Sequence, residues 1–242
     1  FGDLDDFKSL VDEAHALGMK VIIDWVANHT AFDSRWTKEH KEFFLLDSLG
    51  NFQPPLGTDW WDVTQLDWDN GKENGLYEAM QNAMLYWIRE ADIDGFRCDV
   101  AEKVPTEFWN QVRLAMEELK PEVFMLAEAD VPEHHERAFD MSYVWGGMHV
   151  MNQVGSRSWP IDSLRSFLRQ EEQRFPRDAY RMLFVTNHDE NAWNGTVFER
   201  HGKNAEAMTV VASTLLGMPL IYSGQEAPNT KRLRFFEKDT VD

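Results

Sequence analysis

Apolar residues near the start of the chain first recur at helical spacing and then form a continuous run. Between Leu4 and Leu17 they fall on one face of a helix, and Gly18 stands where a glycine commonly ends one. The residues that follow, from Met19 to Asp24, read as a short buried strand. The first 24 residues therefore predict a helix, a tight turn and a strand.

The same unit recurs along the chain. Helical patterns cover residues 77–91, 106–119, 161–173 and 205–216, and apolar strands are expected at 93–99, 123–128, 139–144, 182–186 and 220–223. Alternating helices and short apolar strands predict a parallel sheet covered by helices. Strands that end in polar residues favour part of a (β/α)₈ barrel, whose chemistry lies on the loops at the carboxyl ends of its strands. A doubly wound open sheet is the alternative, weakened by the absence of a glycine-rich phosphate turn after the first strand.

Residues 30–75 interrupt this pattern. They contain Pro54, Pro55 and the aromatic residues Trp60, Trp61 and Trp68. We interpret the segment as a short excursion subdomain on the loop of one barrel strand. Trp60 and Trp61 are candidates for stacking on sugar rings, with packing in the core as an equal alternative.

Composition narrows the classes of partner. The formal net charge of −18 disfavours nucleic acid and anionic membrane surfaces, which both require basic patches. A neutral substrate such as a sugar is compatible with that charge. No apolar run approaches the roughly 20 residues that a membrane-spanning helix needs. Cys98 is the only cysteine, so an intrachain disulfide is excluded.

Acidic side chains at strand ends are the main chemical signal. Asp24, Asp99, Glu128 and Asp189 each lie at the end of an apolar strand and are expected to converge on one rim of the barrel. Clustered carboxylates raise one another's pKa, so such a group costs stability unless it has a function. As a structural alternative, any one of them alone could be a helix cap.

Two of these acids fit different roles in cleaving a glycosidic bond. Arg97 precedes Asp99 by two positions, so both side chains point to the same face of a strand and the guanidinium would hold Asp99 ionised, as a nucleophile requires. Glu128 stands between Ala127 and Ala129, and we expect it to have no cation beside it and to keep its proton as a general acid. Glycoside hydrolysis uses such a pair on opposite sides of the scissile bond.

Five segments resemble the sequence signatures of the alpha-amylase family, glycoside hydrolase family 13. They occur in the family's order and are 24–29 (DWVANH), 95–99 (GFRCD), 125–128 (MLAE), 184–189 (FVTNHD) and 217–226 (GMPLIYSGQE). The resemblance covers nearly the whole chain, and the set is highly specific although any one hexamer could arise by chance.

The resemblance implies a role for each matched residue. Asp99 would be the nucleophile, Glu128 the general acid and then base, and Asp189 the carboxylate that holds sugar hydroxyls in the transition state. The substrate-binding residues would be Arg97, which orients Asp99, His29 and His188, which donate to the sugar, and Asp24, which supports the rim. For each histidine a satisfied buried imidazole is the alternative.

Departures from the family pattern indicate which members of the family this chain resembles more. Residues 100–104 (VAEKV) lack the Lys-His pair that many starch-degrading amylases carry there, so the chain looks more like neopullulanases, cyclomaltodextrinases and related bacterial maltodextrin enzymes. Asn28 matches a calcium ligand of some members, but calcium prefers six to eight oxygen ligands and the excursion is short. We therefore expect no metal site and no cofactor for the chemistry.

By family order the chain is only part of a barrel. Residues 1–29 would hold the second helix and third strand, 30–75 the excursion, and 76–242 the barrel as far as the eighth strand. The first strands and a C-terminal β-domain would then be absent from this sequence. Six strands of eight would leave two sheet edges exposed, which favours a fragment of a longer protein.

The sequence thus predicts a retaining glycosidase acting on α-linked glucans, whether oligosaccharide or polysaccharide, by double displacement. An α-glucosidase or a glucosyltransferase is the nearest alternative, because hydrolysis and transfer differ only in what attacks the intermediate. A non-catalytic barrel that binds a ligand is the alternative from another class.

Overall fold

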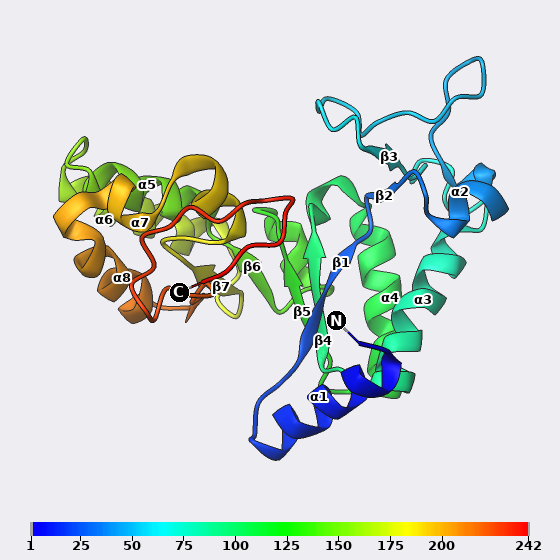
Figure 1. The fold of residues 1–242 in the computed structure, drawn as a ribbon, viewed down its shortest axis with the longest axis horizontal. Helices are drawn as coiled ribbons and strands as arrows, with labels where there is room; N and C mark the ends of the chain where they lie inside the picture. The colour runs from blue at the N-terminus through cyan, green and yellow to red at the C-terminus, as the bar shows by residue number, and fades with distance from the viewer. Residues whose placement is uncertain (1, 242) are drawn as a thin grey trace. The chain divides into compact units, whose positions relative to one another are not determined.

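Parallel strands covered by helices make up the fold, as the hydrophobic pattern predicts (Figure 1). The computed structural model describes residues 2–241. The chain divides into two compact units, one up to Asp140 and one from Met141 onwards. Each unit contains three parallel strands and the helices that follow them.

In the first unit the strands lie in the order β1–β4–β5 and all pairs are parallel. Its main elements are α1 (Leu4–Ala16), β1 (Ile22–Val26), α3 (Leu76–Ala91), β4 (Gly95–Asp99), α4 (Thr106–Leu119) and β5 (Phe124–Ala127). Strands β1 and β4 are parallel neighbours, which a tight hairpin cannot join. A longer crossover connects them, and it includes helix α3. Helices α3 and α4 run side by side along the sheet in Figure 1.

Helix α1 begins where its capping residues predict. The Asp3 carboxylate accepts hydrogen bonds from the backbone N–H groups of Asp5 and Asp6, and the Asp6 carboxylate accepts one from the Asp3 N–H. This reciprocal box satisfies donors that the first turn of a helix leaves free. At the other end, Gly18 takes a left-handed conformation with φ of 76°, which glycine adopts without steric cost.

A buried carboxylate joins the amino-terminal side of the sheet to two helices. Asp94 is 2 % exposed and accepts from the N–H of Val21, from Lys20 Nζ at 3.0 Å and from Lys120 Nζ at 3.1 Å. Its Oδ2 lies 2.7 Å from His15 Nε2. These partners hold the pKa of Asp94 well below its usual range, although burial alone would raise that pKa. The cluster is structural and lies at the end of β4 opposite Asp99.

The core of the first unit lies between the sheet and the helices α3 and α4. Its largest fully buried side chains include Trp109, Phe108 and Phe96. The indole N–H of Trp109 donates to the Ala101 carbonyl at 3.0 Å, so burial of this polar atom is compensated. The core therefore packs directly beneath the segment that follows Asp99.

Residues 29–75 form a small two-stranded arrangement after β1. Its elements are β2 (His29–Ala31), α2 (Arg35–Glu39), a 3₁₀ turn at Lys41–Phe43 and β3 (Val63–Gln65), with β2 and β3 antiparallel. The Trp68 indole donates to the Ala27 carbonyl at 3.1 Å and attaches the segment to the end of β1. The exact domain boundaries given above stay a prediction.

The second unit repeats the parallel arrangement with the order β6–β7–β8. Its elements are β6 (Met141–Tyr143), α5 (Trp145–Gly155), α6 (Ile161–Arg174), β7 (Tyr180–Leu183), α7 (Val197–His201), α8 (Ala205–Thr214) and β8 (Met218–Pro219). Short turns complete the chain: 3₁₀ turns at Ala101–Lys103, Pro132–Glu136 and Gly202–Asn204, and a π-helical turn at Glu190–Asn194.

Two strands of the second unit differ from the sequence expectation. The strand expected at 182–186 begins and ends earlier, and the strand expected at 220–223 is instead the short β8. After the Leu220 N–H donates to the Leu183 carbonyl at 2.8 Å, the chain turns, and the Gln225 N–H donates to the Tyr222 carbonyl. The apolar run alone could not show where that turn starts.

Helix α5 was absent from the expectation because its sequence is apolar almost all round and carries two consecutive glycines. In the structure these glycines allow a close approach: a Cβ on Gly146 would lie 2.9 Å from the ring of Phe167 on α6. Tertiary packing thus outweighs the low helix propensity of glycine. Among the residues the structure describes, no helix combines the length and apolar character needed to cross a membrane.

Candidate active site

Three carboxylates of the first unit gather at the carboxyl ends of adjacent parallel strands. Asp24 lies in β1 opposite Arg97 of β4, Asp99 is the last residue of β4, and Glu128 directly follows β5. The Glu128 N–H donates to the Cys98 carbonyl at 3.0 Å, which continues the β4–β5 ladder past the last strand residue. The sheet register therefore brings these side chains to one edge, as the sequence predicts for the first unit.

A single guanidinium joins all three carboxylates. Arg97 Nη1 lies 2.9 Å from Asp24 Oδ1 and 2.7 Å from Asp99 Oδ1, and Nη2 lies 2.9 Å from Glu128 Oε2. The Arg97 side chain is only 9 % exposed, so these ion pairs form in a poorly hydrated place. The predicted contact between Arg97 and Asp99 is confirmed. The expectation that Glu128 has no cation beside it is wrong, because the strand spacing places the guanidinium between β1 and β5.

Glu128 nevertheless keeps its proton up to about neutral pH, far above the range of an ordinary carboxyl. Burial raises its pKa to about 7, and the negative charge of Asp99 and a hydrogen bond with that carboxyl add to the rise. Arg97 and the Val100 N–H act in the opposite direction and are outweighed. Desolvation penalises the charged carboxylate more than one shared cation can offset.

The residue after Asp99 takes a strained conformation that allows it to donate a hydrogen bond to Glu128. Val100 has φ of 42° and ψ of 45°, a left-handed geometry that β-branched residues rarely adopt. In this conformation its N–H points to Glu128 Oε2 at 3.0 Å. Strain of this kind costs about 1–3 kcal/mol and persists where the surroundings enforce it. Sequence reasoning did not identify Val100, and no local signal distinguishes it.

His29 lies beside this cluster at the start of β2. Burial lowers its pKa, against the charges of Asp99 and Asp62, so the imidazole is neutral at neutral pH. Its ring centroid is 5.4 Å from that of Trp60 in a tilted arrangement. The structure thus brings Trp60 to His29, whereas the Trp61 side chain is 75 % exposed.

Asp189 and His188 belong to the second unit. They follow β7, and Asp189 stands immediately before the π-helical turn Glu190–Asn194. Its Oδ2 lies 3.4 Å from His188 Nε2 and accepts from the Asn187 amide at 3.4 Å. Both side chains remain partly open to solvent, His188 at 45 % and Asp189 at 30 %.

The residues around Asn28 give little support for a metal site. The Asn28 side chain is fully buried, its amide nitrogen lies 3.3 Å from His29 Nδ1, and its Oδ1 has no hydrogen-bond partner. One amide oxygen falls far short of the ligands that calcium requires. Within residues 2–241 there is no group of three or more His, Cys, Asp or Glu side chains that could hold a metal ion. The absence of a cofactor stays a prediction.

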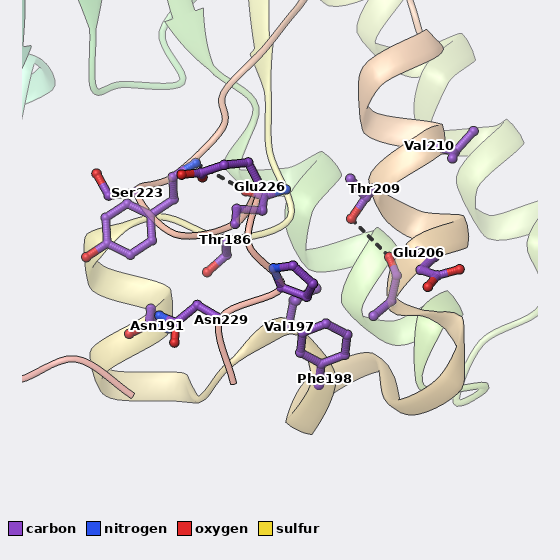
Figure 2. A pocket seen from close by; sticks show the side chains of 14 residues that line it. Thr186, Asn191, Val197, Phe198, Glu206, Thr209, Val210, Ser223, Glu226 and Asn229 are labelled. Carbon is purple, nitrogen blue, oxygen red and sulfur yellow. Dashed lines mark hydrogen bonds between the residues drawn. The ribbon is translucent and has the colours of Figure 1, made fainter. Parts of the chain in front are cut away.

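A cavity of about 300 Å³ lies elsewhere in the second unit (Figure 2). Its walls come from Thr186, from helices α7 and α8, and from the segment 222–229 after β8. The buried Thr186 hydroxyl has no hydrogen-bond partner within the described protein. Neither His188 nor Asp189 lines this cavity, so it is distinct from the predicted catalytic side chains.

Comparison with known proteins identifies relatives of this chain. Residues 1–242 match the alpha-amylase catalytic domain. Over 236 residues the chain is 28 % identical to the alpha-amylase MalA of Haloarcula japonica, covering 93 % of this chain and 34 % of that protein. It is 26 % identical over 257 residues to a cyclomaltodextrinase of a Bacillus species, covering 93 % of this chain and 44 % of that protein.

Solved structures agree with these matches. An alpha-amylase from Lactobacillus plantarum superimposes with a TM-score of 0.88 at 33 % identity, covering 99 % of this chain and 59 % of that one. The predicted fold class, a portion of a (β/α)₈ barrel, is confirmed by this match. The chain spans about a third of MalA and less than two thirds of the solved amylase.

Proposed function

The chain belongs to the alpha-amylase family as part of its catalytic domain, and from this we propose that the full-length protein hydrolyses α-glucosidic bonds of maltodextrins or starch-like glucans with net retention. The observation that carries the proposal is the pair Asp99 and Glu128, joined by Arg97 at 2.7 and 2.9 Å, with the pKa of Glu128 raised to about 7. This pair places a carboxyl in contact with a cation, suited to a nucleophile, beside a carboxyl that keeps its proton up to about neutral pH.

The proximity of the two carboxyls favours retention. Both contact the same guanidinium, Asp99 on Nη1 at 2.7 Å and Glu128 on Nη2 at 2.9 Å, so the two carboxyls are close neighbours. An inverting enzyme holds its two carboxyls roughly 6.5–9.5 Å apart to admit a water molecule, whereas a retaining enzyme holds them roughly 5–5.5 Å apart. The closer arrangement suits direct attack by one carboxylate on the sugar.

In the proposed first step Asp99 attacks the anomeric carbon while Glu128 gives its proton to the departing glycosidic oxygen. Asp99 loses its charge as an ester forms, and Glu128 gains one. The negative charge facing Arg97 is therefore the same before and after the step. Because Arg97 contacts both groups, it can stabilise the Glu128 carboxylate after the step as it stabilises the Asp99 carboxylate before it. The Arg97–Glu128 contact is therefore compatible with an acid role for Glu128.

In the second step water attacks the anomeric carbon and gives a proton to Glu128, while the bond from that carbon to the Asp99 oxygen breaks and the Asp99 carboxylate is restored. We propose that Asp189 holds sugar hydroxyls during both steps, and that His188 and the neutral His29 donate hydrogen bonds to the same sugar. Asp24 would keep Arg97 in position from the side of β1. Stacking of glucosyl units on Trp60 and Trp61 stays a prediction, favoured for Trp60 by its contact with His29.

The test is release of reducing sugar from maltodextrin by the full-length protein. We expect Asp99→Asn and Glu128→Gln each to lower kcat by about 10³-fold or more, since each removes a group that acts only in the transition state. Asp33→Asn, an exposed acid in the excursion, is the matched control and should retain full activity.

Three outcomes separate the candidate functions. A folded wild-type protein that releases no sugar would favour the binding-module alternative. Products longer than the substrate in the presence of added maltose would identify a glucosyltransferase. Equal loss of activity in Asp33→Asn and Asp99→Asn would contradict the assigned nucleophile.

A further inference from the structure

Three large aromatic side chains of the second unit form an exposed cluster, which we call the aromatic platform: Trp193, Phe235 and Phe236. Their side chains are 59 %, 39 % and 75 % exposed. The ring centroids of Trp193 and Phe235 are 5.1 Å apart, those of Phe235 and Phe236 are 4.8 Å apart, and those of Trp193 and Phe236 are 6.1 Å apart. Contiguous exposed aromatic surface of this kind marks a binding surface more often than scattered apolar residues do.

The aromatic platform is continuous with His188 and Asp189 of the same unit. The Phe235 ring stacks against His188, with centroids 6.1 Å apart and planes 19° from parallel. His188 in turn contacts Asp189. Trp193 lies on the π-helical turn that begins directly after Asp189. A ligand held by His188 and Asp189 would therefore extend along the aromatic rings.

Polar contacts, some of them made by the buried Asn191, join the two segments that carry the platform. Asn191 is 4 % exposed, its amide donates to the Lys231 carbonyl at 3.2 Å, and its Oδ1 accepts from the Leu233 N–H at 2.7 Å. On the same segment Arg232 Nε lies 2.9 Å from Glu199 Oε2. The Asn191 contacts join residues 231–233 to the turn that carries Trp193, and the Arg232 contact joins the same segment to α7.

The π-helical geometry helps to present Trp193. Glu190 at the start of the turn is buried, and its Oε1 accepts from the Asn194 amide at 2.9 Å. One extra residue in the turn shifts the following side chains relative to an α-helix, and such turns are frequent at functional sites. The turn thus keeps Glu190 inside and leaves the Trp193 indole facing solvent.

We propose that the aromatic platform binds a glucosyl unit of the α-glucan chain, adjacent to the sugar that His188 and Asp189 hold. The proposal rests on the function given above, since it takes the same substrate. A sugar ring presents an apolar C–H face that suits a flat ring, and the Trp193 indole N–H can donate to a hydroxyl. The occupant is a neutral sugar because the platform leads directly from the side chains that would bind the sugar at the cleaved bond.

The experiment compares three variants of the full-length protein: Trp193→Ala, Trp193→Phe and the control Trp159→Ala. Trp159 is an exposed tryptophan of the same unit, 42 % exposed, that precedes α6. Calorimetry would measure maltoheptaose binding in an Asp99→Asn background, where no turnover occurs. Steady-state kinetics would compare KM for maltoheptaose with KM for maltotriose.

Loss of the ring should weaken maltoheptaose binding about 3- to 10-fold in Trp193→Ala, the range expected for one aromatic contact. KM for maltoheptaose should rise more than KM for maltotriose, because a three-unit chain can also bind productively in registers that leave the platform empty. Trp193→Phe keeps a flat ring and should recover most of the affinity, while Trp159→Ala should bind like the unchanged protein.

The outcomes distinguish this proposal from the proposed function. Wild-type hydrolysis with identical affinities in Trp193→Ala and Trp159→Ala would overturn the platform and leave the function standing. Binding without hydrolysis, weakened only in Trp193→Ala, would support the platform and contradict the function. A change of oligomeric state in Trp193→Ala with unchanged sugar binding would identify the cluster as a contact between protein molecules and would also overturn the proposal.

Discussion

The surroundings of Glu128 predict a measurable pH dependence of catalytic activity. Its pKa of about 7 means that the carboxyl is protonated below neutral pH and ionised above it. A general acid works only in the protonated form. We therefore expect kcat/KM for maltodextrin to fall as pH rises through about 7, with the high-pH limb belonging to Glu128.

A substrate that needs no acid provides the control. Fluoride leaves without a proton, so kcat/KM of the wild-type protein for α-maltosyl fluoride should lack the limb near pH 7. Glu128→Gln should retain much more of its first-step activity on the fluoride than on maltodextrin. A limb that persisted unchanged with the fluoride would assign the titration to another group.

At the scale of single residues, Arg97 shows why contacts between neighbouring strands decide the electrostatics. Its position two residues before Asp99 predicts one contact, and that contact is present. Its second and third partners, Asp24 and Glu128, come from the strands on either side of β4. A cation that serves three acids lowers the repulsion among them, while burial still keeps one of them protonated.

At the scale of elements, the β4–β5 pair depends on a glycine at its amino-terminal end. Gly95 has φ of 155°, and a Cβ placed there would lie 1.8 Å from the Phe124 carbonyl oxygen of β5. No flexible side chain can move aside, because the obstacle is backbone. The close approach explains why β4 begins with the one residue that has no side chain.

Gly95→Ala is accordingly expected to destabilise the protein by about 3 kcal/mol or more, combining a strained conformation with overpacking. Gly18→Ala is the matched control: Gly18 also has positive φ, at 76°, but nothing lies within 4 Å of an added Cβ. Its cost should be about 1 kcal/mol, from backbone conformation alone. Urea unfolding curves measure both, and equal losses would contradict the role of the Phe124 contact.

The helices differ in how far their local sequence determines them. Helix α1 carries its own start signal in Asp3 and Asp6, and its position follows from local sequence. Helix α5 has no such signal, and its glycines are explained only by the Phe167 ring that packs against them. Elements with strong local signals were predictable, and those stabilised by distant partners were not.

At the scale of the whole molecule, the net charge of −18 should make stability depend on salt, while the binding of a neutral substrate should not depend on it. A neutral glucan is not steered by charge, so KM for maltodextrin should stay constant between about 50 mM and about 500 mM NaCl, a range over which the Debye length falls from about 14 Å to about 4 Å. Self-repulsion of the chain is screened over the same range, and Tm should rise. A KM that changed several-fold with salt would point to a charged substrate.

The sequence alone determined the class of the molecule and the identity of its main chemical groups. The alternation of helices with short apolar strands predicted a helix-covered parallel sheet, because burial on both faces requires continuous apolar strands. The two-residue period of a strand predicted the Arg97–Asp99 contact. The five family signatures predicted the family that the comparisons show.

Only the tertiary structure decided how these groups interact. The contact of Arg97 with Glu128, the left-handed Val100 that donates to Glu128, and the aromatic platform beside His188 all join residues from different elements. Their distances depend on strand register and on how segments pack. Local sequence governs backbone preference and periodicity, but contacts between remote segments arise when the chain has folded, and it is those contacts that set the pKa of Glu128 and the shape of the site.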